Sequence, residues 1–192
     1  MSFKEKVQMA DRCDATVSRG ASHSEVTSIS GYYTVECHDA NGNLKWKDDI
    51  HNLVTTVGKD LTMDTILSNS TSAGAGVSYM GLKGTGTPDV ADTQGSHATW
   101  NEVGGAHAPT YTGNRQSPSY SAAAAGVKST SAAVVFAMTG SGTVAGCFIN
   151  IGGSATKDDT SGTLFSAGDF TAGSKTVTAG DTLSVTYSAT AA

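Results

Sequence analysis

Apolar and polar side chains alternate along residues 32 to 51 in a pattern that predicts two neighbouring strands, each with one buried face. The inward positions are Tyr33, Val35 and Cys37 in the first strand and Leu44, Trp46 and Ile50 in the second. Asn41 and Gly42 lie between the strands and accept the positive φ angles of a tight type I′ turn. This stretch therefore predicts a β-hairpin.

A short helix is predicted after the hairpin, because apolar residues then recur at helical spacing. Its apolar face would carry Val57, Leu61, Ile66 and Leu67. Gly58 and Asp60 suit its start, and Asn69 and Ser70 suit its end. We expect this helix to cover one end of the sheet and to serve packing.

Glycine-punctuated β patterns continue to the end of the chain. Strands are predicted at 78–82, 132–138, 144–151, 163–166, 174–178 and 182–188. The turn at 140–142 predicts a hairpin between the second and third of these strands, and the turn at 179–181 predicts one between the last two. Short strands without alternating long helices predict an all-β fold, an antiparallel β-sandwich of jelly-roll or immunoglobulin-like type.

The domain organisation follows from where these patterns begin. Residues 1–30 are polar and show no sustained period, so we expect an extended N-terminal arm followed by one sandwich domain over 31–192. Such an arm either stays disordered or orders on a partner, and the sequence leaves both open. Residues 84–126 hold all three prolines and predict a long connecting loop suited to partner contacts.

The amino-acid composition limits the classes of binding partner that we expect. Only 15% of the 192 residues are charged, which suits a β-domain and also suits surfaces that another protein covers. The net charge of −5 gives no basic field to hold phosphates, so we expect no direct nucleic-acid binding. The N-terminus lacks the apolar core of a signal peptide, and no apolar run approaches the roughly 20 residues of a membrane span. We therefore expect synthesis in a cytoplasm and no membrane contact.

The candidate catalytic and metal-binding motifs do not have the residue spacing that these functions require. The run from Asp39 to Asn43 resembles a calcium loop, but its glycine is fourth and its twelfth residue is Ile50. No G-x-S-x-G elbow or complete phosphate loop is present, and the five histidines lack metal-ligand spacing. Cys13, Cys37 and Cys147 form no C-x-x-C pair and are interpreted as buried thiols. We expect no enzyme, no cofactor and no metal, although a metal site assembled from distant residues stays open.

Several short motifs over residues 32–188 resemble a family of tailed-bacteriophage virion structural proteins. They are Trp46-Lys47-Asp48, Asn52-Leu53-Val54-Thr55, Gly58-Lys59, Tyr79-Met80-Gly81-Leu82, Tyr111-Thr112-Gly113-Asn114-Arg115, Gly140-Ser141-Gly142-Thr143-Val144 and Gly180-Asp181-Thr182-Leu183. The resemblance implies a structural protein without catalytic residues, and the best-fitting role is a head decoration, or cement, protein on the capsid exterior. It implies the major capsid protein and copies of the chain itself, as trimer or dimer, as partners. Synthesis would then take place in the cytoplasm of a bacterial host.

Candidate partner-contact residues lie in the arm and in the proline-containing loop. They are Phe3, Lys4, Lys6, Arg12, Trp100, Tyr111, Arg115 and Tyr120. Two alternatives stay open: a tail, neck or baseplate component, and a carbohydrate- or receptor-binding module in which Trp100, Tyr111 and Tyr120 stack on sugars. Trp46 is expected in the core because of its place in the strand alternation.

Overall fold

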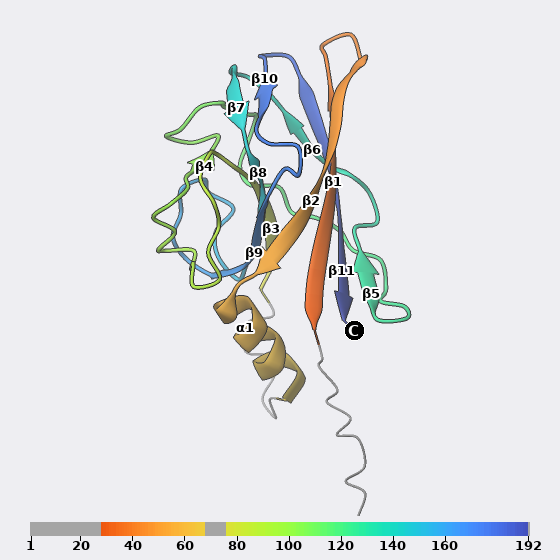
Figure 1. Ribbon diagram of the computed structural model, residues 1–192, viewed down its shortest axis with the longest axis vertical. Coiled ribbons are helices and arrows are strands. Elements are labelled where there is room, and N and C mark those ends of the chain that lie inside the picture. The colour runs from red at the N-terminus through yellow and green to blue at the C-terminus, as the bar shows by residue number, and fades with distance from the viewer. Residues whose placement is uncertain (1–27, 68–75, 192) are drawn as a thin grey trace, which may run out of the picture.

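The computed structural model describes residues 28–67 and 76–191, and within them it is built from antiparallel strands and one short helix (Figure 1). In chain order the elements are β1 Ile29–His38, β2 Leu44–Val54, α1 Thr56–Leu67, β3 Ser78–Lys83, β4 Glu102–Val103, β5 Val127–Ser129, β6 Val134–Ala137, β7 Gly142–Val144, β8 Gly146–Ile151, β9 Thr163–Asp169, β10 Lys175–Val177 and β11 Thr182–Ala191. The predicted all-β class is confirmed.

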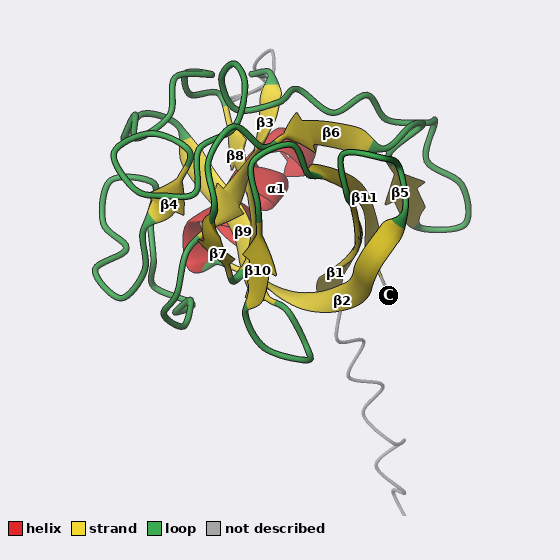
Figure 2. Ribbon diagram, turned by 90° about the horizontal axis from the view of Figure 1, so that it is seen from above, coloured by secondary structure: helices red, strands yellow, loops and turns green. Residues whose placement is uncertain are grey.

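Nine of the strands form one curled sheet. Its order is β4-β3-β8-β9-β2-β1-β11-β5, with β6 also paired to β11, while β10 and β7 form a separate pair. Strand β2 connects the two halves, because most of it pairs with β1 while Leu53 and Val54 at its end pair with β9. Seen from above, the strands surround the core (Figure 2).

The core lies between the two halves of this sheet. Tyr33, Val35 and Cys37 of β1 are fully buried, as the alternation predicts, and they share one cluster with Cys147 and Ile149 of β8. Strand β8 is buried on both faces, because its Phe148 joins a second cluster around Trp100. Both described cysteines, Cys37 and Cys147, are free buried thiols, as predicted, and Cys13 lies outside the described residues.

The β1–β2 hairpin is confirmed, but its predicted turn type is wrong. The amide of Gly42 donates to the carbonyl oxygen of Asp39 at 2.9 Å, and Gly42 alone in the turn has a positive φ, of 85°. A type I turn followed by a left-handed glycine and a bulge has this geometry, whereas type I′ needs positive φ at two residues. The carboxylate of Asp39 also accepts hydrogen bonds from the Asn41 and Asn43 amides, each at 2.8 Å, and holds the loop in this form.

Both later hairpin predictions are wrong, because the strands pair elsewhere. Strand β6 pairs with β11 and not with β8, and β10 pairs with β7 and not with β11. The turn before β11 exists, with the amide of Thr178 donating to the carboxylate of Asp181 at 2.7 Å. It carries the chain from the small two-stranded pair into the large sheet, where β11 lies against β1 over ten residues.

Helix α1 follows β2 directly and is held at its first turn. The hydroxyl of Thr55 accepts a hydrogen bond from the Gly58 amide at 3.1 Å, which makes Thr55 the N-cap, and it donates to the carbonyl oxygen of Leu164. A Cβ on Gly58 would lie 2.3 Å from the carbonyl oxygen of Phe165, so only glycine permits this approach to β9.

The rest of α1 departs from the predicted packing role. On the predicted apolar face Val57 and Leu61 are half-buried, but Ile66 and Leu67 are 69% and 71% exposed, so the face is covered only toward the start of the helix. Met63 is also 51% exposed. The expected helix-end residues Asn69 and Ser70 lie outside the described residues, as does the arm up to residue 27. Strand β1 begins at Ile29, two residues before the predicted domain boundary. None of the described helical segments has the length and apolar character of a membrane span.

Candidate functional site

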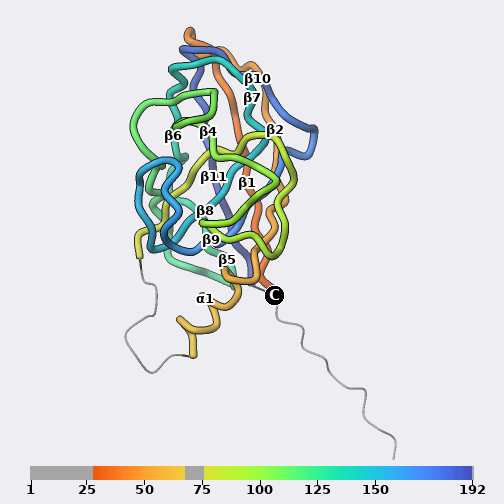
Figure 3. Tube along the Cα trace, turned by 90° about the vertical axis from the view of Figure 1, so that its left-hand side faces the viewer, coloured from red at the N-terminus to blue at the C-terminus, as the bar shows by residue number. Residues whose placement is uncertain are grey.

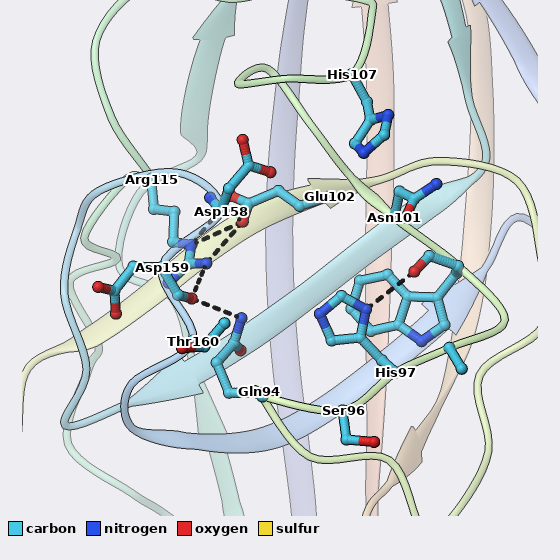
Figure 4. Close-up of a pocket in the computed structure, with 13 residues that line it drawn as sticks. Gln94, Ser96, His97, Asn101, Glu102, His107, Arg115, Asp158, Asp159 and Thr160 are labelled. Carbon is cyan, nitrogen blue, oxygen red and sulfur yellow. Dashed lines mark hydrogen bonds and ion pairs between the residues drawn. The ribbon is translucent and has the colours of Figure 1, made fainter.

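A polar pocket lies among the loops that flank β4 and follow β8. Its cavity volume is about 390 Å³, and residues 94–102 and 158–160 supply most of its lining. Figure 4 shows the two loops facing each other across it, with His107 above and Ser96 below. We call this cavity the loop pocket.

A buried ion pair connects the two walls of the loop pocket. The guanidinium of Arg115 donates to both carboxylate oxygens of Glu102, with Nη2 to Oε2 at 2.6 Å and Nε to Oε1 at 3.0 Å. Arg115 also donates to the carbonyl oxygens of Ser154 at 3.1 Å and Asp159 at 2.7 Å. Both side chains are almost fully buried, so the pair fixes the loop after β8 against β4.

Two lysines, Lys83 and Lys157, hold the loops through hydrogen bonds to backbone carbonyl oxygens. The ammonium of Lys83, on β3, is fully buried and donates to the carbonyl oxygens of Gly84 and Gly86 and to the carboxylate of Asp169. Lys157 donates to the carbonyl oxygen of Tyr111 at 2.7 Å and lies 3.8 Å from the centre of its ring. Burial lowers the pKa of both lysines, which is the expected effect of removing an ammonium group from water.

Trp100 and His97 form the flat side of the loop pocket. The two rings stack with centroids 4.0 Å apart and planes 20° from parallel. The indole of Trp100 donates to the carboxylate of Asp92 at 2.9 Å and is otherwise packed against Phe148. Trp100 belongs to the lining but is only 2% exposed, so His97 is the more accessible of the two rings at the cavity.

The structure places the expected partner-contact residues as follows. Trp100, Tyr111 and Arg115 are buried and make their contacts inside the chain, and burial raises the pKa of the Tyr111 phenol well above its usual range. Tyr120 is half-buried and shares a hydrogen bond of 3.2 Å with Ser78. Phe3, Lys4, Lys6 and Arg12 lie outside the described residues. Of the four that the structure describes, Trp100 and Arg115 belong to the lining of the loop pocket.

Sequence reasoning missed the residues that complete the loop pocket. Gln94, His97, Glu102 and His107 carry no spacing motif. They lie in and around β4, and the distant loop that completes the pocket, with Asp158 to Thr160, reaches them because β3 pairs with both β4 and β8. The carboxylate of Asp159 accepts a hydrogen bond from the Ser161 amide at 2.9 Å and supports a local turn, whereas the carboxylate of Asp158 accepts one from the Ala106 amide at 2.7 Å in the facing loop. Within the described ranges no three histidine, cysteine or acidic side chains are close enough to hold a metal ion.

A second, apolar surface lies at the end of the molecule that carries α1. A groove of about 250 Å³ runs between the helix and the sheet, lined by Leu61, Thr62, Thr65, Ile66, Ile151 and Phe165. An adjoining apolar recess shares Ile151 and Phe165 with it and extends to Tyr120. We call the groove, together with exposed Met63 and Leu67, the α1-end surface; Figure 3 shows α1 projecting from this end of the strands.

Comparison of the chain with known protein families and with curated proteins finds no match.

Proposed function

We propose that this chain is a structural protein of a tailed bacteriophage that binds the outer surface of the capsid and stabilises the shell. The observation that carries the proposal is the concentration of exposed apolar side chains at one end. Of the nine exposed large hydrophobic residues in the described part of the chain, Met63, Ile66 and Leu67 lie on α1, and Leu53 and Val77 lie in the segments before and after it. Apolar patches that stay exposed on a charge-poor domain mark surfaces that bind another protein.

The place where β1 begins also supports this end of the molecule as the docking face. Strand β1 starts at the same end of the molecule as α1, so residues 1–27 join the domain at the end that carries the α1-end surface (Figure 1). An arm that orders across a neighbouring subunit would extend the contact at a cost in conformational entropy. Together the two would give a contact to the major capsid protein without any chemistry.

Bound copies would stabilise the shell because each one adds protein–protein interface between capsomers. A specific protein contact buries about 1,600 Å², and a rigid clip between capsomers must be detached before the shell opens. Repetition over the particle adds avidity to each modest contact. Copies would meet at local symmetry axes of the shell as trimers or dimers.

We also propose a specific type of β-fold for the chain. We infer that the curled sheet is a variant of the jelly-roll or immunoglobulin-like β-sandwich. The half that holds β1 and β11 faces the half that holds β3 and β8, and both contribute side chains to one core cluster. The continuous path through β2 would then be a strand that belongs to both sheets.

The docking face is tested by binding purified protein to capsids that lack it. We expect Ile66→Asp with Leu67→Asp to weaken binding by about tenfold or more, because burying carboxylates against an apolar partner is unfavourable. Val135→Asp is the matched control, since Val135 is 50% exposed on β6, away from α1. Equal binding by both variants, measured by co-sedimentation, would sink the assignment of this face.

The arm is tested separately with a variant that lacks residues 1–27, which leaves β1 intact. We expect weaker capsid binding and unchanged thermal unfolding of the domain. Unchanged affinity would remove the arm from the mechanism and leave the α1-end surface as the whole contact.

A further inference from the structure

We propose that the loop pocket binds a neutral saccharide. The inference concerns a site at the loops, separate from the α1-end surface, and does not depend on the capsid role. It rests on the shape of the cavity, on an unpaired buried polar atom in its wall and on the balance of donors and acceptors around it.

The cavity has the size and wall of a small-ligand site. Its volume of about 390 Å³ lies within the ~300–1,000 Å³ of typical ligand pockets, which fits a mono- or disaccharide. In Figure 4 Gln94 and Thr160 lie on one side of the cavity and His97, Asn101 and His107 on the other, and the buried Glu102–Arg115 pair holds the surrounding loops together. The pocket is therefore built before any ligand arrives.

The Gln94 side chain carries the main evidence for a ligand. It is only 2% exposed, its Nε2 group donates to the carbonyl oxygen of Asp159 at 3.4 Å, and its Oε1 atom has no hydrogen-bond partner. A buried acceptor without a partner costs about 1–3 kcal/mol. The Oε1 atom has almost no accessible surface, so a ligand hydroxyl reaches it only after the carboxamide turns toward the cavity. In Figure 4 the Gln94 carboxamide extends into the space between Thr160 and His97.

His97 adds a second acceptor and a flat surface. Its Nδ1 lies 2.9 Å from the carbonyl oxygen of Trp100, which can only accept, so Nδ1 donates this hydrogen bond and, in the neutral imidazole, Nε2 is an acceptor. One face of the imidazole is stacked on Trp100, and its other face is free of that ring. A sugar ring can lie on such a face with its C–H groups and direct its hydroxyls to the polar side chains around it.

Donors lie on the opposite side of the cavity. Figure 4 places Asn101 and His107 across from Gln94, and both side chains are exposed. A hydroxyl group both donates and accepts, so it suits a site where acceptors and donors face each other. A polyhydroxylated ligand would pair with both sides at once.

Other ligand classes fit less well. An anion would meet the carboxylates of Asp158 and Asp159, while the only arginine in the lining is already paired with Glu102. A metal ion lacks a ligand cluster in the described residues. An apolar ligand would find no exposed large apolar side chain in the lining, because Trp100 is buried. A neutral, hydroxyl-rich molecule remains.

The test is a binding screen of the full chain against neutral and acidic glycans. One arm titrates free methyl glycosides and disaccharides and follows amide chemical shifts; the other uses immobilised bacterial envelope polysaccharides, so that free sugars and surface polymers are distinguished. We expect a neutral glycan to shift the amides of residues 94–101 and 158–160. No binding in either arm, or binding of acidic glycans only, would overturn the proposal.

Three variants then place the ligand. Asn101→Ala and His107→Ala should each weaken binding about tenfold, the loss expected for one or two hydrogen bonds, while exposed Asn114→Ala is the matched control and should not. Gln94→Met removes the unpaired oxygen at similar volume and should abolish binding while the melting temperature is retained. A glycan that binds all of these variants equally well would place the site elsewhere and overturn the assignment.

Discussion

At the scale of single residues, buried charges decide how the loops are held. Arg115 and Glu102 are both almost fully buried, and each nitrogen of the guanidinium donates to at least one acceptor in the chain. Such a pair is not in itself a source of large stability, but removing one partner leaves an uncompensated buried charge. The pair therefore specifies the arrangement of the loops.

We predict that Arg115→Ala or Glu102→Ala lowers the free energy of unfolding by about 3–5 kcal/mol, because the remaining charge is left unpaired. Urea unfolding followed by fluorescence measures this loss. Lys47→Ala is the control, since Lys47 pairs with Glu36 at 2.9 Å on the surface and should change stability little. Similar effects at the two sites would contradict the role given to the buried pair.

Cys37 gives a prediction for alkaline pH. Burial, and then the nearby charge of Asp181, raises the pKa of its thiol from the ordinary 9.0 to about 11. Between pH 9 and 11 the unfolded chain releases this proton while the folded chain keeps it, so the free energy of unfolding falls as pH rises. Below pH 9 both states keep the proton, so the Cys37 thiol does not make the free energy of unfolding depend on pH there.

Comparison with Cys37→Ala isolates this contribution. The variant should lose stability less steeply than the native chain between pH 9 and 11, because the buried tyrosines titrate alike in both. Chemical denaturation at a series of pH values gives the two slopes. Parallel slopes would show that the Cys37 thiol is not the group responsible.

At the scale of elements, the β1–β2 hairpin depends on one backbone conformation. Gly42 has φ of 85°, and a Cβ there would meet nothing within 4 Å, so any cost of substitution comes from the backbone alone. We predict that Gly42→Ala lowers the free energy of unfolding by about 1–2 kcal/mol. Gly42→Asn should lose less, because Asn tolerates this region. Thermal unfolding of the two variants separates them, and equal losses would contradict the turn geometry.

Elements were predictable from the sequence where the signal is local. The alternation of Tyr33, Val35 and Cys37 reports directly which face of β1 is buried, and the structure agrees. Pairing was not predictable in the same way. The turn before Thr182 reverses the chain, but whether β11 pairs with β10 or with β1 depends on packing between distant segments. Turn residues specify a change of direction and not the partner strand.

Helix α1 was predictable as an element, but what covers its apolar face was not. Its apolar residues recur at helical spacing, and the helix forms where the sequence predicts it. Periodicity alone does not say whether a partner covers the face that it marks. Ile66 and Leu67 remain exposed in the isolated chain, and under our account the capsid surface covers them.

At the scale of the whole molecule, the chain presents two different surfaces. One is the apolar α1-end surface, at the end where β1 begins, and the loops that flank β4 carry the polar loop pocket. The sequence pointed to residues 84–126 as a contact region, but it could not show that Trp100, Tyr111 and Arg115 are buried. Their burial depends on Asp92, Glu102 and Lys157, which reach them only through the tertiary fold.

The most direct test of the central claim is quantitative mass spectrometry of purified virions that encode this chain, with heads and tails separated before analysis. Decoration of the capsid predicts that the chain is found with the heads, at a ratio to the major shell protein near one or a simple fraction of it. A few copies per particle, or recovery with the tails, necks or baseplates, would contradict capsid decoration.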